Sequence, residues 1–91
     1  MEIEFDPKKR DWTLRQRALD FADARFLFTG QEVTFADVRR SYGESRYLTF
    51  GRLGDLQVVI AWTPRLKGGE IVCRIISMRR ANEKEIAALR E

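Results

Sequence analysis

The sequence predicts a single small α+β domain in which an antiparallel sheet of about four strands packs with two N-terminal helices and a C-terminal helix. Apolar residues recur at helical spacing before Gly30, and the period changes to two after it. A final helical segment follows the strands, so helices and strands are segregated along the chain. The 91 residues suffice for one modest hydrophobic core. We therefore expect one domain over residues 1–91.

A short strand and a well-capped helix open the chain. Residues 2–5 alternate charged and apolar side chains, which predicts a strand. Asp6 can accept hydrogen bonds from the free backbone N–H groups of the next helix, and Pro7 suits the first turn because its missing N–H is not needed there. The expected apolar stripe of this helix consists of Trp12, Leu14 and Ala18.

A second helix is predicted from Asp20 to Gly30. Asp20 is placed as its N-terminal cap, and Asp23 three residues later favours the positive end of the helix. Four apolar side chains at helical spacing are expected to face the core: Phe21, Ala24, Leu27 and Phe28.

Strand periodicity then predicts strands at residues 31–36, 46–52, 56–63 and 71–78. A polar connection over 39–44 and a hairpin turn at 53–55 separate the first three. Pro64 has no N–H for the sheet, so we expect it to end the third strand and to begin a loop over 64–69. Asn82, with Glu85 three residues later, predicts the start of the last helix.

Composition excludes several classes of protein. The longest apolar run, Val58 to Trp62, is too short to cross a bilayer, and the first residues lack the features of a signal peptide. We therefore expect a cytoplasmic protein with no membrane partner. With one cysteine and no histidine, the chain has no internal disulfide and none of the usual zinc sites, so no metal or cofactor is expected. Cys73 is expected to be a buried thiol.

Positive charge is concentrated in the middle of the chain. The formal net charge is +3, but residues 39–80 contain nine basic and three acidic side chains. Residues 1–38 contain six basic and eight acidic side chains, and residues 81–91 contain two and three. This distribution predicts a polyanionic partner, either nucleic acid or an acidic protein surface.

Side-chain alternation places several arginines on strand faces. In the strand 46–52, one face carries Arg46, Leu48, Phe50 and Arg52, and the other carries Tyr47, Thr49 and Gly51. In the last strand, one face is expected to carry Val72, Arg74, Ile76 and Met78, and the other Ile71, Cys73, Ile75 and Ser77. Arg79 and Arg80 leave the end of that strand.

An arginine cannot lose its charge, so each of these side chains needs a carboxylate, a phosphate or water. We interpret Arg46, Arg52, Arg74 and Arg79 or Arg80 as a group that converges at one edge of the sheet and binds RNA phosphates. The alternative is structural: ion pairs with Glu44, Asp37 or Glu83, or solvated charges at strand ends.

The candidate chemistry is RNA cleavage without a metal ion, because the sequence has no glycine-rich phosphate loop and no carboxylate cluster with metal-ligand spacing. In such a reaction the 2′-hydroxyl attacks the adjacent phosphate, and cations stabilise the added negative charge. Glu44, Glu83 and Tyr47 are the candidate general bases. Base stacking on Tyr47, Phe50 or Trp62 would contribute about 1 to 3 kcal/mol per base, but packing within the protein is the favoured interpretation.

Three motifs resemble one family. Arg74-Ile75-Ile76-Ser77-Met78-Arg79-Arg80-Ala81 closely resembles the Arg-Ile-Ile-Ser-Ala-Arg-Arg-Ala signature of BrnT toxins. Asp6-Pro7 with Lys9, Phe21 and Ala24 resembles the opening helix pair of that family, and Gly43-Glu44-Ser45-Arg46 with Gly51 is similar to the start of its Gly-Glu-x-Arg strand. On these motifs the chain is identified as a BrnT-like toxin.

The resemblance implies a RelE-like fold and a ribonuclease toxin of a type II toxin-antitoxin system that inhibits translation. It also implies neutralisation by a BrnA-type antitoxin with a ribbon-helix-helix domain, through which the complex binds operator DNA. By position, the matching residues that we assign to the catalytic site are Arg46, Arg74, Ser77, Arg79 and Arg80. Glu44 joins them as a candidate base, and the candidate RNA-binding residues are Arg52, Tyr47 and Arg17.

The sequence departs from the family in and after the first helix, where Thr13, Gln16, Arg17 and Ala18 replace the usual Asn, Lys, His and Gly. Arg17 keeps a positive charge at the histidine position but cannot shuttle a proton near neutral pH. Two alternatives to an active toxin follow. One is a toxin fold without catalysis that acts as antitoxin partner and co-repressor, and the other is a simple RNA-binding protein whose affinity falls steeply with salt.

Overall fold

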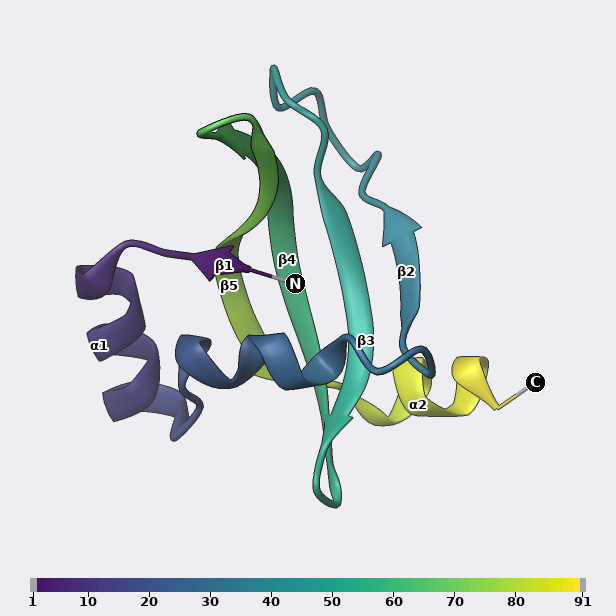
Figure 1. Cartoon of the computed structure of the whole chain (residues 1–91). Helices are drawn as coiled ribbons and strands as arrows, with labels where there is room; N and C mark the ends of the chain where they lie inside the picture. Colours follow the sequence, from purple (N-terminus) through teal and green to yellow (C-terminus); the bar gives the residue numbers. More distant parts are fainter. Residues whose placement is uncertain (1, 91) are drawn as a thin grey trace.

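The computed structural model describes residues 2–90 and confirms the α+β class, with a five-stranded mixed sheet (Figure 1). Its elements are β1 (Ile3–Glu4), α1 (Pro7–Arg17), the 3₁₀ helix η1 (Phe21–Leu27), β2 (Val33–Ala36), β3 (Tyr47–Leu53), β4 (Leu56–Lys67), β5 (Glu70–Arg80) and α2 (Glu83–Leu89). The strands lie in the order β1-β5-β4-β3-β2. Strands β2 to β5 are antiparallel as predicted, whereas β1 pairs parallel with β5 and adds a fifth strand.

The helices begin at the predicted capping residues. The Asp6 carboxylate accepts a hydrogen bond from the backbone N–H of Lys8 at 2.9 Å. In α2, the side chains of Asn82 and Glu85 each accept a hydrogen bond from the backbone N–H of the other, at 2.8 and 2.9 Å. Asp20 caps η1. These short-range bonds satisfy N–H groups that the helices themselves leave unpaired.

The hydrophobic core lies between η1 and one face of the sheet, which we call the core face. Phe21, Ala24 and Leu27 of η1 are each at most 1 % exposed, as predicted, although η1 ends at Leu27 and not at Gly30. From the sheet, the core receives Val58, Ile60, Cys73, Ile75 and Met78. The opposite side of the sheet, toward which α2 lies, is called the open face (Figure 1).

The apolar stripe predicted for α1 is wrong. Trp12 is 48 % and Leu14 39 % exposed, whereas Thr13 is only 3 % exposed. The reason is that α1 stands beside the β5 edge of the sheet and does not lie across a face (Figure 1). At the end of α1, Arg17 donates a hydrogen bond to the Met78 carbonyl at 2.8 Å, on the part of β5 beyond its pairing with β1.

The prediction that Pro64 ends its strand is also wrong. Strand β4 continues to Lys67 and β5 begins at Glu70, so a two-residue turn replaces the predicted loop. Pro64 lies opposite Cys73, whose N–H points away from β4 because it donates to the Glu2 carbonyl at 2.9 Å. Pro64 and Cys73 therefore exchange no hydrogen bonds, and the missing proline N–H removes none from the sheet.

A β-bulge in β5 changes the predicted faces of that strand. Ala61 of β4 lies opposite Ser77, but its neighbour Trp62 lies opposite Ile75, so Ile76 is an extra residue on β5. The extra residue reverses the alternation beyond it. The core face of β5 consequently carries Cys73, Ile75 and Met78, and the register places Arg74, Ser77 and Arg79 toward the open face.

Candidate nucleic-acid interface

A row of five residues crosses the open face at the end of the sheet where β3 begins. Glu4 lies beside Arg74, and Arg74 lies opposite Thr63. The pairing of β3 with β4 places Arg46, directly before β3, next to Thr63. Asp37 lies next to Arg46 in turn, and its N–H donates to the Arg46 carbonyl at 2.8 Å. Neighbouring strands are about 4.8 Å apart, so the backbones of Arg46 and Arg74 are about 10 Å apart. We call these five residues the charged row.

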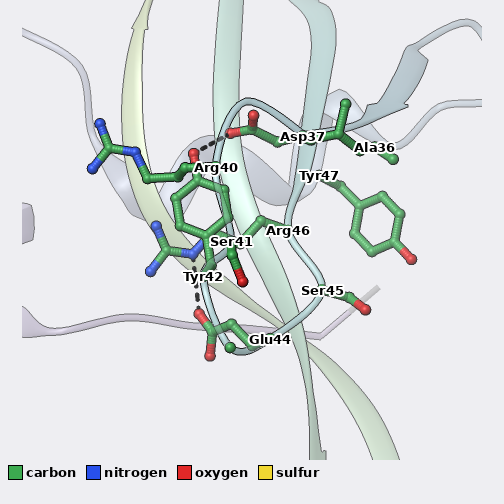
Figure 2. Close-up of a pocket in the computed structure, with 11 residues that line it drawn as sticks. Ala36, Asp37, Arg40, Ser41, Tyr42, Glu44, Ser45, Arg46 and Tyr47 are labelled. Carbon is green, nitrogen blue, oxygen red and sulfur yellow. Dashed lines mark hydrogen bonds and ion pairs between the residues drawn. The ribbon is translucent and has the colours of Figure 1, made fainter.

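Arg46 is held between a carboxylate and an aromatic ring (Figure 2). Its Nε donates to Glu44 at 3.1 Å, and its guanidinium carbon lies 4.1 Å from the centre of the Tyr42 ring. The other Glu44 oxygen is 3.7 Å from a guanidinium nitrogen of Arg65. The cation–π contact and the ion pair together orient the Arg46 side chain over the sheet.

Asp37 anchors the loop that carries these residues. Its side chain is 3 % exposed and accepts two hydrogen bonds from the Arg39 guanidinium, both at 2.8 Å. The Tyr42 hydroxyl donates to the same carboxylate at 3.0 Å. The Arg39 hydrogen bonds hold the pKa of Asp37 well below its usual range. Asp37 is therefore ionised at every pH near neutrality and fixes Tyr42 against Arg46.

Arg79 lies on the same face, two strand positions beyond Ser77. It forms a two-pronged ion pair with Glu85 of α2, at 2.7 and 2.8 Å, which raises the pKa of Arg79 and lowers that of Glu85 to about 2. The positive charge of Arg39 acts in addition on both groups, lowering the pKa of each.

At the β1 edge, Arg74 is 34 % exposed and bonds Glu4 through one terminal nitrogen at 3.4 Å. The second Glu4 oxygen lies 3.9 Å from the Lys67 ammonium. In the guanidinium groups of Arg46 and Arg74, the atoms that form hydrogen bonds with residues 2–90 are Nε of Arg46 and one terminal nitrogen of Arg74. The remaining N–H groups of both residues are available to an anion such as a phosphate, which guanidinium binds in a forked geometry.

The predicted convergence of arginines does not extend to Arg52 or Arg80. Arg52 shares the open face but is six residues from Arg46 along the strand, which is about 20 Å, and pairs with Asp55 at 3.7 Å. Arg80 is exposed and lies opposite the core residue Val58, so it faces away from Arg79. The open face instead gathers Arg39, Arg46, Arg65, Lys67, Arg74 and Arg79.

Tyr47 lies on the core face, away from Arg46 (Figure 2). Its ring packs on Trp62, with ring centres 5.1 Å apart, and the Trp62 indole donates to Thr49 at 2.8 Å. Packing within the protein is thus confirmed for both aromatic residues. Phe50 packs as well, but against Phe35 on the open face, at 5.9 Å between ring centres.

The structure places the other predicted residues away from the charged row. The Arg17 guanidinium donates a hydrogen bond to the Met78 carbonyl, and Ser77 lines a cavity beside α1. Glu83 is exposed in the first turn of α2, and its neighbour Glu85 is the partner of Arg79. Of the carboxylates proposed as a base, Glu44 is the one that contacts an arginine of the row.

Sequence analysis missed several residues of this face: Glu4, Arg39, Tyr42, Thr63, Arg65 and Lys67. Four of them lie within the segments 39–44 and 64–69, for which composition predicts loops. The sequence predicts Asp37 as an ion-pair partner of the strand arginines, whereas its partner in the structure is Arg39. The dense run of charged and polar residues from Asp37 to Arg46 is the sequence signal that could have identified this region.

Comparison with known proteins decides the family. The model of the family described as "Ribonuclease toxin, BrnT, of type II toxin-antitoxin system" matches residues 5–85, which is most of the chain. The chain belongs to the BrnT family. It is accordingly a toxin of a type II toxin-antitoxin system with ribonuclease activity, and a cognate antitoxin is its partner.

The BrnT match includes the Arg74–Ala81 motif and every residue of the charged row except Glu4. No curated protein matches this BrnT chain. Among residues 2–90, no helix is long and apolar enough to cross a membrane.

Proposed function

We propose that this BrnT chain is a metal-independent endoribonuclease of RelE-like fold, formed by one domain over residues 1–91, which inhibits translation by cutting RNA bound across the charged row. The observation that supports this proposal is the placement of Arg46 and Arg74 about 10 Å apart on one face, each with uncommitted N–H groups. Guanidinium groups so placed bind two sides of one phosphate or two successive phosphates.

In the proposed reaction, the 2′-oxygen of a ribose forms a bond to the adjacent phosphorus, and the bond from phosphorus to the 5′-oxygen breaks. Arg46 and Arg74 stabilise the extra negative charge on the phosphate oxygens in the transition state. Arg79, on the same face, extends the positive field along the bound strand. The departing 5′-oxygen takes a proton from solvent, so the products are a 2′,3′-cyclic phosphate and a free 5′-hydroxyl.

Glu44 is the proposed acceptor of the 2′-hydroxyl proton. It lies beside the charged row, 3.1 Å from Arg46, and its side chain is 32 % exposed, so solvent can exchange the proton. Tyr47 is set aside because its ring packs on the opposite face. Arg17 cannot replace the family histidine in proton transfer, since a guanidinium stays protonated and this one is bonded to Met78.

We propose a BrnA-type antitoxin with a ribbon-helix-helix domain as the partner that neutralises the toxin and carries the complex to operator DNA. The six cations of the open face favour an acidic segment of that antitoxin as the group that covers them. Such a segment would compete with RNA for the same guanidinium groups.

A second candidate function is a binding module without catalysis. The observation that favours it is that Arg46, Arg74 and Arg79 already have carboxylate partners, in Glu44, Glu4 and Glu85. In that case the row serves stability and antitoxin binding. Purified protein that binds its antitoxin tightly but leaves RNA intact would favour this function.

Growth of cells with induced expression tests the proposal. Wild-type protein is expected to stop growth, and Arg46→Ala, Arg74→Ala or Arg79→Ala is expected to relieve the arrest. Arg15→Ala, a change of an exposed arginine in the last turn of α1, is the matched control and is expected to remain toxic. Normal growth with abundant soluble wild-type protein would overturn the proposal.

A further inference from the structure

A cavity lies between α1 and the edge of β5, apart from the charged row. Its volume is about 340 Å³, which falls in the range of sites for small ligands. Trp12, Phe21 and Ile76 form its apolar walls, and the Trp12 ring is 48 % exposed. An exposed tryptophan beside an apolar hollow provides a flat surface on which another ring can stack.

Three polar groups of residues that line this cavity form no hydrogen bond with another of residues 2–90. Thr13 is 3 % exposed and Ser77 is partly buried, yet neither hydroxyl, nor the indole N–H of Trp12, forms a hydrogen bond with another of residues 2–90. Among residues 2–90, no fully buried side-chain nitrogen or oxygen lacks a partner, so the hydroxyls of Thr13 and Ser77 are accessible, and both residues line the cavity. They offer both donors and acceptors to a bound molecule.

The rim of the cavity is positively charged. Lys8, Lys9 and Arg17 line it, and the Arg17 guanidinium carbon lies 5.2 Å from the centre of the Trp12 ring. The ion pairs that α1 forms within residues 2–90 involve Arg10, so neither lysine is neutralised by a carboxylate there. The cavity therefore attracts an anionic molecule that has a flat apolar part.

The position of Ser77 connects this cavity to the proposed cleavage site. Ser77 is three residues after Arg74 and two before Arg79, or about 10 Å and 7 Å along β5. We propose that the cavity binds one unpaired base of the RNA substrate, stacked on Trp12 and hydrogen-bonded at its edge by Thr13 and Ser77. This inference rests on the proposed ribonuclease function and names a base-binding subsite for it.

The chemistry of the walls favours a nucleobase over an apolar side chain from a protein partner. Inserting a leucine or phenylalanine would cover the Thr13 hydroxyl without supplying a hydrogen bond, which is unfavourable for a buried polar group. A base has a π face for Trp12 and polar atoms at its edge, and its phosphates reach the lysines of the rim.

Binding of an uncleavable RNA tests the subsite. The probe is a short 2′-O-methyl oligonucleotide, compared with the same oligonucleotide carrying abasic sugars. Trp12→Leu is expected to weaken binding of the base-containing probe by about 5- to 150-fold, the range expected for loss of one base stack. Lys9→Gln serves as a second variant that leaves the aromatic wall intact, and it is expected to weaken both probes.

Phe26→Leu is the matched control. Phe26 is 53 % exposed and has the Arg25 guanidinium 4.8 Å from its ring centre, so it resembles Trp12, but the ring does not line this cavity. The control should bind both probes as the wild type does. The inference is overturned if Trp12→Leu and Phe26→Leu bind the base-containing probe equally, or if the abasic probe binds the wild type as tightly as the complete one.

Cleavage of ordinary RNA by the wild type is measured in parallel, so that failure of the base-binding subsite can be distinguished from failure of the ribonuclease function. Cleavage without any effect of Trp12→Leu on binding overturns the subsite and leaves the ribonuclease. Binding that depends on Trp12 without cleavage overturns the ribonuclease and leaves a base-binding site. If only the antitoxin, and neither RNA probe, quenches Trp12 fluorescence, a protein partner is the occupant and the inference is wrong.

Discussion

Replacing Ala18 by glycine is predicted to stabilise this protein. Ala18 follows α1 in the left-handed conformation, with φ 57° and ψ 32°, and its N–H donates to the Leu14 carbonyl at 3.1 Å. It is the one residue other than glycine with a positive φ among residues 2–90. A β-carbon is unfavourable in this conformation, whereas glycine adopts it freely.

The magnitude follows from two opposing terms. The left-handed conformation costs a non-glycine residue about 1 to 2 kcal/mol, and the change removes that cost. Glycine also has more conformational freedom in the unfolded chain, which lowers stability by about 0.4 to 1 kcal/mol. Ala18 is exposed, so little packing is lost. The net gain is about 0.5 to 1 kcal/mol, which raises Tm by about 2 to 8 °C in a domain of this size.

Thermal and urea unfolding followed by circular dichroism measure this change. Ala88→Gly is the matched control, because Ala88 is also exposed but lies within α2, where glycine lowers stability by about 0.5 to 1 kcal/mol. The two substitutions should therefore shift Tm in opposite directions. A loss of stability for Ala18→Gly similar to that of Ala88→Gly would refute the reasoning.

Three further predictions concern packing and ionisation. The Arg79 hydrogen bonds lower the pKa of Glu85 to about 2, so the pair stabilises the fold above about pH 4.5, and this stabilisation is lost as the pH falls toward 2. When the urea concentration at half-unfolding is plotted against pH, Glu85→Gln should flatten the acid side of the curve. An unchanged curve would count against the ion pair. Burial raises the pKa of Cys73 to about 12, so native protein at pH 8 should react with a thiol reagent far more slowly than protein in urea, and equal rates would show an exposed thiol. Gly51→Ala would bring a β-carbon to 2.9 Å from Leu27 Cγ and should reduce the free energy of unfolding, measured by denaturant titration, by about 1 to 3 kcal/mol. Unchanged stability would mean that η1 and β3 are farther apart than this distance requires.

Local chemistry explains which parts of the fold could be predicted from sequence. The caps at Asp6, Asp20 and Asn82 depend on hydrogen bonds between residues two or three apart, and all three form. The core-facing residues of η1 follow from spacing along one segment. Both are properties that neighbouring residues determine by themselves.

The errors arose where distant segments decide the outcome. Pro64 stays within a strand because Cys73, opposite it, turns its N–H toward the segment before β1. The bulge at Ile76 moves Met78 into the core, and no local pattern of the sequence marks it. Proline and alternation rules describe an isolated strand, whereas the pairing between strands settled both cases.

The candidate site was predictable to a similar extent. Arg46 and Arg74 were found because Arg74 lies in a strand and Arg46 directly precedes one, so that alternation fixes the face of each. Arg39 and Tyr42 were missed because a loop brings them over the sheet through the buried carboxylate of Asp37, and loop conformation does not follow from periodicity.

The central claim is that RNA is cleaved across the charged row without a metal ion, and the ends of the RNA products test it most directly. Purified protein is incubated with single-stranded RNA in excess EDTA, and the 3′ ends are identified by mass spectrometry. We predict 2′,3′-cyclic phosphates, a loss of rate of at least about 100-fold in Arg46→Ala and Arg74→Ala, and retained cleavage in Arg52→Ala, which changes an arginine on the same face of β3 about 20 Å away. Cleavage that requires an added divalent cation, or that falls equally in Arg46→Ala and Arg52→Ala, would contradict the claim.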